Sequence, residues 1–221
     1  MRKLTILTTI LLLFSSFGFA ACPSGMVSYW TFDNETVSGS TVQDVYGSND
    51  GSINGATVGA EGMVGEAFEF DGNDDFININ TGIVDFNSPF TIILWGDHEG
   101  TGGDGDFFCF SDDDTTDNYL MMHISLTGGG VLRTYNQYGD NTWEAVGTKD
   151  ISQGWHQSVL SVDADGVAKI YSDGSFEDQT QKSGYLSYLD TAMIGGFEAT
   201  ASEFVERYFD GRIDEVAIFN R

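Results

Sequence analysis

The hydrophobic and polar residues of this chain alternate over short runs, and clusters of Gly, Asp, Asn and Ser separate one run from the next. Runs of Val, Ile, Phe, Tyr and Thr with a period of two are typical of β-strands, and no stretch after residue 20 has a helical period of useful length. The pattern therefore predicts an all-β sandwich. The predicted strands are Met26–Asp33, Gly51–Thr57, Ala67–Asp71, Phe76–Asn80, Phe90–Trp95, Phe107–Phe110, Tyr119–Ser125, Val131–Tyr135, Trp155–Val162, Val167–Ser172, Ala192–Gly195 and Tyr208–Phe219.

Two Asp-Gly pairs, at positions 165–166 and 173–174, predict tight hairpin turns. Asp-Gly supplies the positive φ angles that primed two-residue turns require. The first pair makes Trp155–Val162 and Val167–Ser172 antiparallel neighbours. No repeat or linker indicates a second domain.

The last predicted strand carries a carboxylate within an apolar row. Asp214, Val216 and Ile218 are two residues apart and would share one face of a regular strand. If that face points to the core, Asp214 is a buried charge, which is costly unless it is paired, hydrogen-bonded or bound to a metal ion.

The first twenty residues have the composition of a secretory signal. Residues 1–3 are basic, residues 4–17 are apolar but too few to span a bilayer comfortably, and Gly18-Phe19-Ala20 places small residues where a signal peptidase cleaves. We therefore expect a signal peptide over residues 1–20 and one secreted domain over residues 21–221, with no membrane span in the mature chain. The alternative is an uncleaved anchor helix.

Two cysteines follow the predicted signal, Cys22 and Cys109. In an oxidising compartment they can form one disulfide that ties the N-terminus of the mature chain to its body. The alternative is lipidation of Cys22, because residues 19–22 (Phe-Ala-Ala-Cys) look like a bacterial lipobox with Phe in place of the usual Leu-type residue. Lipidation would leave Cys109 unpaired.

The charge of the chain is strongly negative, with 34 Asp and Glu against 9 Lys and Arg and a formal net charge of −25. Such a surface repels nucleic acid and anionic lipid, so we expect neither as a partner. It suits divalent cations, or a high-salt environment that screens the self-repulsion. A solvated acidic surface without a specific role explains most of these carboxylates equally well.

Seven motifs follow one another along the chain. They are Val27-Ser-Tyr-Trp-Thr-Phe-Asp33, Asp44-Val-Tyr-Gly-Ser-Asn-Asp-Gly51, Gly65-Glu-Ala-Phe-Glu-Phe-Asp-Gly-Asn-Asp-Asp-Phe76, Phe90-Thr-Ile-Ile-Leu-Trp95, Gly154-Trp-His156, Tyr171-Ser-Asp-Gly174 and Gly211-Arg-Ile-Asp-Glu-Val216. In this order they resemble the laminin-G-like jelly-roll domains of the concanavalin A-like lectin/glucanase superfamily. The resemblance covers essentially the whole mature chain except residues 96–118 and 133–150, and it implies two stacked antiparallel sheets.

The resemblance also implies a structural calcium ion. In such jelly rolls the first and last strands are commonly antiparallel neighbours, which would bring Asp33 close to Asp214. The loop over residues 44–50 could close over the same point and add Asp44 and Asn49, and calcium takes six to eight oxygen ligands of this kind. The alternative is that Asp33 and Asp214 cap turns by accepting backbone N–H groups.

Two further acidic segments have a simpler interpretation. Asp71–Asp75 is interpreted as a tight hairpin turn in which Asp side chains bond their own backbone, rather than as a second cation site. Asp112–Asp117 is interpreted as a solvated loop, because it lacks the Gly and the distal Glu of an EF-hand loop.

The catalytic residues of the related glucanases are absent. Those enzymes carry Glu-x-Asp-x-(x)-Glu on one strand, with the two Glu side chains as nucleophile and acid/base. The nearest segment here begins with Arg212 in place of the first Glu, and Glu215 is out of phase for the second. His98 and His123 have no Cys or His at ligand spacing, and His156 lies in a motif of packed strand residues. The sequence therefore predicts a protein that is not an enzyme.

One stretch combines aromatic rings with polar side chains, as carbohydrate sites do. Pyranose rings stack on aromatic faces, and their hydroxyls pair with Asp and Asn side chains. The candidate residues are Tyr135, Tyr138, Asp140, Asn141 and Trp143, with Tyr185 and Tyr188 as a second possibility. The alternative is that these rings pack against the edge of the sandwich.

Together these observations predict a secreted, non-catalytic domain that binds glycan at or outside the cell surface and is stabilised by calcium. One alternative is a structural or adhesive surface protein that binds a protein partner or its own copies through exposed strand edges. The other is a glycoside-active enzyme with a non-standard site.

Overall fold

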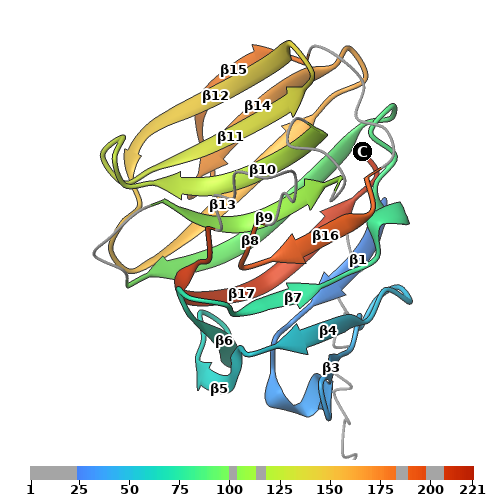
Figure 1. Ribbon diagram of the computed structural model, residues 1–221, viewed down its shortest axis with the longest axis vertical. Coiled ribbons are helices and arrows are strands. Elements are labelled where there is room, and N and C mark those ends of the chain that lie inside the picture. The colour runs from blue at the N-terminus through green and yellow to red at the C-terminus, as the bar shows by residue number, and fades with distance from the viewer. Residues whose placement is uncertain (1–23, 100–103, 113–117, 183–188, 198–206) are drawn as a thin grey trace, which may run out of the picture.

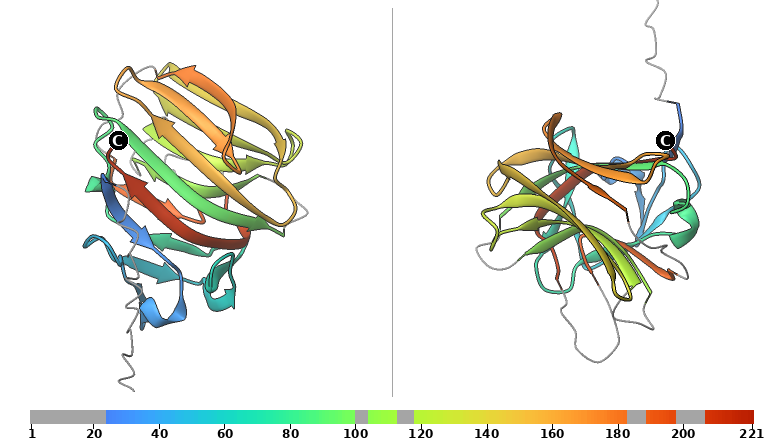
Figure 2. Two further views of the ribbon diagram at one scale, coloured as in Figure 1. Left: turned by 180° about the vertical axis from the view of Figure 1, so that it is seen from behind. Right: turned by 90° about the horizontal axis from the view of Figure 1, so that it is seen from above.

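The computed structural model describes residues 24–99, 104–112, 118–182, 189–197 and 207–221. These residues form β-strands and two 3-10 turns, η1 (Asn34–Thr36) and η2 (Thr81–Ile83), without any α-helix. The strands build two antiparallel sheets that stack face to face (Figures 1 and 2). The predicted all-β jelly-roll sandwich is therefore confirmed.

The first sheet, sheet A, has the strand order β15-β14-β13-β8-β17-β6-β5. β1 also pairs with β17, along the C-terminal half of that strand, whereas β6 pairs along its N-terminal half. The strands of sheet A are β1 (Met26–Trp30), β5 (Thr57–Glu61), β6 (Glu66–Asp71), β8 (Phe90–His98), β13 (Trp155–Val162), β14 (Val167–Ser172), β15 (Ser175–Gln181) and β17 (Asp210–Phe219).

The second sheet, sheet B, has the strand order β12-β11-β10-β9-β16-β7-β4-β3-β2. Its strands are β2 (Val37–Ser38), β3 (Thr41–Val42), β4 (Gly51–Asn54), β7 (Phe76–Asn78), β9 (Gly105–Ser111), β10 (Asn118–Ser125), β11 (Val131–Tyr138), β12 (Asn141–Asp150) and β16 (Thr191–Ile194).

The core fills the space between the two sheets and fixes which side chains point away from it. On β10, Leu120, Met122 and Ile124 belong to the main hydrophobic cluster. Because successive side chains on a strand point to opposite faces, Tyr119 and His123 lie on the outer face of sheet B. The alternation that builds the core therefore also builds the outer face on which the candidate site lies.

The sequence missed two long strands, β12 and β15. Both are edge strands, and edge strands tolerate charged and polar residues because only one side is paired within the sheet. The two edges meet and close the sandwich: the N–H groups of Val146 and Thr148 donate to Asp178 and Glu177 on β15 at 3.0 and 2.8 Å. The stretch over residues 133–150, which matches none of the family motifs, thus lies in the hairpin of β11 and β12.

The prediction that Asp214 shares a face with Val216 is wrong, because β17 contains a bulge. Ile213 and Val216 both belong to the core although they are three positions apart. The register shifts between Asp214 and Ala217, and Glu215 adopts a positive φ of 54°. A bulge inserts one extra residue into a strand and changes the phase of its side chains. Asp214 therefore lies opposite residue 95 on the outer face of sheet A.

Other predictions concern the N-terminus and the cysteines. The predicted signal peptide and the lipobox lie outside the described residues. Cys109 is a free, buried cysteine, and Cys22 lies outside the described residues, so the predicted Cys22–Cys109 disulfide is not shown. Among the residues described, no helix has the length and apolar character needed to cross a membrane.

Candidate functional site

The outer face of sheet B contains a cavity of about 260 Å³, which we call the sheet B cavity. Alternate residues of β10 and β11 line it, and one further side chain comes from the segment before β17. The lining residues are Tyr119, Met121, His123, Arg133, Tyr135 and Arg207. It thus combines aromatic rings with cationic and titratable groups.

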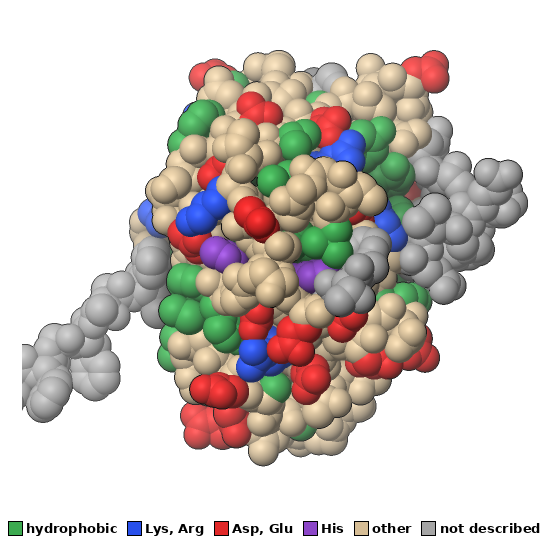
Figure 3. All heavy atoms as spheres, turned by 90° about the vertical axis from the view of Figure 1, so that its left-hand side faces the viewer, with side chains coloured by type: hydrophobic (Ala, Val, Ile, Leu, Met, Phe, Trp, Pro, Cys, Tyr) green, Lys and Arg blue, Asp and Glu red, His purple; other side chains and the backbone are tan. Residues whose placement is uncertain are grey.

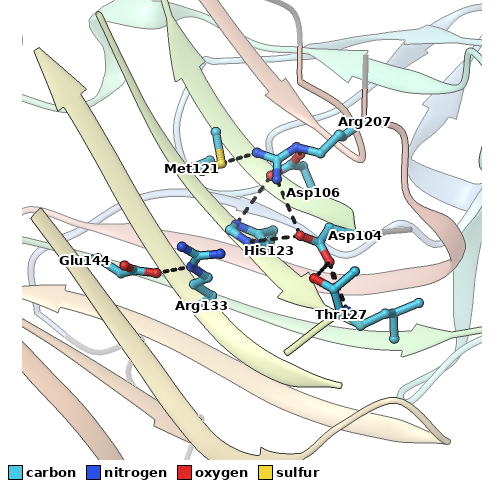
Figure 4. Close-up of polar contacts among 9 residues, drawn as sticks. Asp104, Asp106, Met121, His123, Thr127, Arg133, Glu144 and Arg207 are labelled. Carbon is cyan, nitrogen blue, oxygen red and sulfur yellow. Dashed lines mark hydrogen bonds and ion pairs between the residues drawn. The ribbon is translucent and has the colours of Figure 1, made fainter. Parts of the chain in front are cut away.

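His123 forms the floor of the cavity, and Asp106 lies beside it on β9 without lining the cavity itself; they are 1% and 0% exposed. The pairing of β9 with β10 sets these two residues opposite each other, next to a register shift. Nδ1 of His123 lies 3.8 Å from Oδ1 of Asp106, and Nε2 lies 4.0 Å from Oδ2 of Asp104 (Figure 4). Both distances exceed hydrogen-bond length.

Arg207 forms one wall of the cavity. Its Nε lies 3.1 Å from Oδ2 of Asp106, and its Nη1 lies 3.7 Å from Oδ2 of Asp104. The guanidinium also contacts the sulfur of Met121 and lies 5.6 Å from the ring centroid of Phe197. Arg207 is therefore held between two carboxylates on one side and apolar groups on the other (Figure 4).

Arg133 and the two tyrosines form the other wall. The guanidinium of Arg133 pairs with Glu144 on β12 and lies 5.8 Å from the ring centroid of Tyr135. The ring of Tyr135 is 5.9 Å from that of Tyr119, whose hydroxyl donates to Oε1 of Gln137 at 2.9 Å. These contacts hold two aromatic rings beside two paired arginines.

The burial of this cluster changes its titration. Burial raises the pKa of Asp106 to about 7, against the opposing effect of Arg207 and with a smaller contribution from the negative charge of Asp104. Burial lowers the pKa of His123 well below its usual range, and the charges of Arg207 and Arg133 lower it further. The imidazole is therefore uncharged at neutral pH, and Asp106 titrates near neutrality.

Several buried polar atoms at and beside the cavity have no partner in hydrogen-bond geometry among the described residues. They are both ring nitrogens of His123, both carboxyl oxygens of Asp106 and Nε of Arg207; the last lies 3.1 Å from Oδ2 of Asp106 and forms an ion pair with it. A buried polar group without a partner costs free energy, so such groups normally meet water or a ligand. The set includes donors and acceptors side by side, which is what a ligand with several hydroxyl groups can satisfy.

The structure separates the five residues predicted to bind carbohydrate. Tyr135 lines the sheet B cavity. Tyr138 is 37% exposed near the end of β11, and Asp140 and Asn141 lie at the exposed turn into β12. Trp143 is 4% exposed and belongs to the core, because the alternation of β12 turns it inward, so its ring is not available for stacking on a sugar. Tyr185 and Tyr188 lie outside the described residues.

Sequence reasoning missed most of the cavity. The alternation of Tyr119, Met121 and His123 within one predicted strand is a signal that could have placed these three side chains on one face. No comparable signal existed for Asp106 and Arg207, which are about a hundred residues apart in the sequence and converge on His123 only in the fold.

Two of the predicted calcium ligands, Asp44 and Asn49, cap the loop between β3 and β4. Oδ1 of Asp44 accepts the N–H groups of Tyr29, Tyr46 and Gly47, and Oδ2 accepts that of Asn49. These bonds lower the pKa of Asp44 although burial opposes them. Because its oxygens are already occupied by N–H donors, Asp44 does not fit the role of a calcium ligand.

The other two predicted ligands, Asp33 and Asp214, lie in a second cluster beside the bulge of β17. β1 is antiparallel to β17, as expected, and the Tyr29 hydroxyl donates to Glu215. Burial and the charges of Glu215, Asp214 and Asp33 raise the pKa of Tyr29 above its usual range. Asp214 is 0% exposed; its Oδ2 accepts the N–H of Val64 at 3.0 Å, and its Oδ1 has no partner among the described residues.

A third acidic cluster lies in the connection from sheet A to sheet B. Asp71, Asp74 and Asp75 each place a carboxylate oxygen within 4.8 Å of the other two. The segment is not a hairpin turn, because it connects β6 of sheet A to β7 of sheet B. The interpretation that its Asp side chains bond their own backbone is correct: Asp71 accepts the N–H of Asn73 at 2.9 Å, and Asp75 accepts that of Asp71 at 3.0 Å.

A family model described as "Concanavalin A-like lectin/glucanases superfamily" (Laminin_G_3) matches residues 71–221, more than half of the chain. The chain belongs to this superfamily. The match includes every strand of the sheet B cavity and β17. No curated protein sequence matches the chain.

Solved structures with the same fold include domains of carbohydrate-active proteins. One is domain 4 of AbnA, a GH43 extracellular arabinanase from Geobacillus stearothermophilus, in complex with arabinotriose (TM-score 0.67, 20% identity, 88% of this chain and 92% of that one). Another is the sialidase of Trypanosoma rangeli (TM-score 0.65, 16% identity, 90% of this chain), of which the match spans only 31%. A third is the CBM40 domain of the IT-sialidase of Ruminococcus gnavus (TM-score 0.59, 12% identity, 70% and 90%).

The superfamily includes lectins and glucanases, and the segment nearest to the glucanase motif lies on β17. Arg212, which replaces the first Glu of that motif, pairs with Asp97, and its Nε lies 3.2 Å from Oε1 of Glu99. Its guanidinium is 5.4 Å from the ring centroid of Trp155 on sheet A. At the motif position, the chain therefore presents a paired cation rather than a catalytic carboxylate.

Proposed function

We propose that this protein is a non-catalytic carbohydrate-binding domain and that the sheet B cavity is its binding site. The observation that carries the proposal is a cavity walled by two tyrosine rings and two arginines, with both ring nitrogens of His123 at its floor lacking a hydrogen-bond partner among the described residues. A sugar hydroxyl can donate to a carboxylate oxygen or an imidazole nitrogen and accept from a guanidinium. The adjacent rings offer apolar faces to the ring of the sugar.

The structural relatives support this class of ligand at the level of the fold. The arabinanase domain was solved with arabinotriose, and another neighbour is a CBM40 domain of a sialidase. The arabinanase is an extracellular enzyme, which agrees with action outside the cell. We therefore propose an extracellular or cell-surface glycan as the partner.

The geometry of the carboxylates supports binding without hydrolysis. Retaining and inverting glycosidases need two carboxyl groups that flank a scissile bond. In the cavity, Asp106 has no exposed surface, and both Asp106 and Asp104 are engaged with Arg207. These carboxylates hold the wall of the cavity, so we expect no release of reducing sugar from labelled oligosaccharides.

A pair of tyrosine variants tests the binding site. We expect Tyr135→Ala to weaken binding of the glycans selected on an array at least tenfold, about 1.4 kcal/mol, because it removes a ring from the cavity wall. Tyr138→Ala is the matched control: it removes the same side chain from the same strand but outside the cavity. Equal loss in both variants, measured by calorimetry, would remove the cavity as the site.

We further propose that a calcium ion binds beside the bulge of β17, with Asp214 as its central carboxylate ligand and Asp33 nearby. Oδ1 of buried Asp214, which has no partner among the described residues, supports this choice, whereas both oxygens of Asp44 already accept backbone N–H groups. Such an ion would neutralise carboxylates that otherwise repel one another where β1 and β6 meet along β17.

A further inference from the structure

We propose that the sheet B cavity selects uncharged sugars and rejects uronic and sialic acids. This inference rests on the proposed function, because it concerns the ligand class of the same site. It is an inference from the charges around the cavity, and it does not follow from the relatives, two of which come from sialidases.

Both arginine side chains of the cavity already form ion pairs within the protein. Arg133 pairs with Glu144, and Arg207 lies against Asp106 and Asp104 (Figure 4). Two guanidinium groups thus face three carboxyl groups, which leaves no excess positive charge for an anion. The guanidinium groups of Arg133 and Arg207 are only partly exposed, so a sugar carboxylate that approached either one would compete with Glu144, Asp104 or Asp106 for the same positive charge.

Among the described residues that line the cavity, no other group supplies a positive charge. His123 is buried between Arg133 and Arg207, and both arginines oppose its protonation. A bound anion would also approach Asp104 and Glu144, which are more accessible than the floor and carry like charge. The local charge pattern therefore disfavours an anionic ligand at each position it could occupy.

The negative charge of the surface beyond the cavity also disfavours an anionic ligand. The chain carries 34 acidic against 9 basic side chains, and acidic groups outnumber basic ones on the face shown in Figure 3. Such a surface lowers the local concentration of anions at low ionic strength. A neutral sugar experiences none of this repulsion, and its hydroxyls can pair with the ring nitrogens of His123 without separating any ion pair.

The test compares matched neutral and acidic sugars. Oligosaccharides of galactose and galacturonate, and of glucose and glucuronate, differ within each pair only at C6, and arabinotriose and sialyllactose extend the set. We expect the intact protein to bind at least one neutral sugar and to bind its acidic counterpart at least tenfold more weakly at 150 mM salt. Acidic sugars that bind as tightly as neutral ones would overturn the inference but leave the carbohydrate site in place.

Two variants test whether the ion pair of Arg133 with Glu144 causes the selectivity. Glu144→Gln frees Arg133, so the difference in affinity between a neutral sugar and its acidic counterpart should become at least tenfold smaller. Asp140→Asn is the control, because it removes a charge from the same hairpin at the exposed turn. An unchanged gap in Glu144→Gln, or an equal narrowing in both variants, would overturn the inference. If no sugar binds to the intact protein, the proposed function itself fails.

Discussion

Asp106 is the residue whose protonation most affects the sheet B cavity. It is buried, it faces His123 and Asp104, and it pairs with Arg207. The imidazole stays uncharged at neutral pH, so the change in charge of the floor near pH 7 comes from this carboxyl group. A buried group whose pKa differs between the folded and the unfolded state makes the free energy of unfolding depend on pH.

The free energy of unfolding should fall as the pH rises from about 4 to about 7. The pKa of Asp106 is about 7 in the folded protein but near 4 in the unfolded chain, so the folded state binds its proton more tightly. Its contribution is complete below pH 4 and is lost as the pH rises through 7, with a slope of at most about 1.4 kcal/mol per pH unit. Urea unfolding at four pH values measures the slope.

The variant Asp106→Asn removes one titrating group and should make this part of the profile shallower, while Asp214, whose pKa burial also raises to about 7, still contributes in the same window. Asp44, whose pKa is lowered, acts in a different window, because its contribution is lost only as the pH falls below about 4. Parallel profiles for the native protein and Asp106→Asn between pH 4 and 7 would show that Asp106 is ionised throughout.

At the scale of elements, the sequence predicted strands well where they are buried and poorly where they are edges. β13 and β14 were predicted at their observed bounds, because their apolar residues alternate and an Asp-Gly turn separates them. β12 and β15 were missed because their polar residues suit an edge. The bulge at Glu215 was missed because Asp214, Val216 and Ile218 fit one uninterrupted alternation, which concealed the change of phase after Ile213.

The candidate site was predicted less completely than the fold, for a reason that also lies in the elements. Tyr135 was chosen for its side chain, and its strand does carry it to the cavity. Trp143 was chosen on the same grounds, yet the phase of β12 turns it into the core. Asp106 and Arg207 reach His123 through pairings that are distant in the sequence, so composition within one segment could not reveal them.

The loop between β3 and β4 should depend on Asp44 and not on calcium. Asp44→Ala removes a carboxylate that accepts four backbone N–H groups, and hydrogen bonds to charged groups contribute about 1.5–3 kcal/mol each. We expect a loss of at least about 2 kcal/mol in unfolding free energy, measured in urea with a chelator present. A loss that appears only with calcium present would instead make Asp44 a metal ligand.

At the scale of the whole molecule, the net charge of −25 must be separated from any specific metal site. Every cation screens the repulsion among 34 acidic side chains, so added calcium stabilises such a chain even without a site. Screening depends on ionic strength, whereas a site depends on the free calcium concentration and on particular ligands. The two effects therefore respond differently to sodium chloride.

Calcium should raise the melting temperature by several degrees at constant high ionic strength. An ion that binds only the folded state adds about 3–4 kcal/mol when its concentration is 100 to 1,000 times the dissociation constant. Asp214→Asn should abolish the shift, because the variant removes a buried carboxylate with an unpaired oxygen. Asp210→Asn removes an exposed carboxylate from the same strand and should retain it. If both variants keep the full shift in melting temperature, calcium binds away from the bulge. If the native protein shows no such shift at high ionic strength, calcium acts by screening alone. Asp33 and Asp214 are then structural caps.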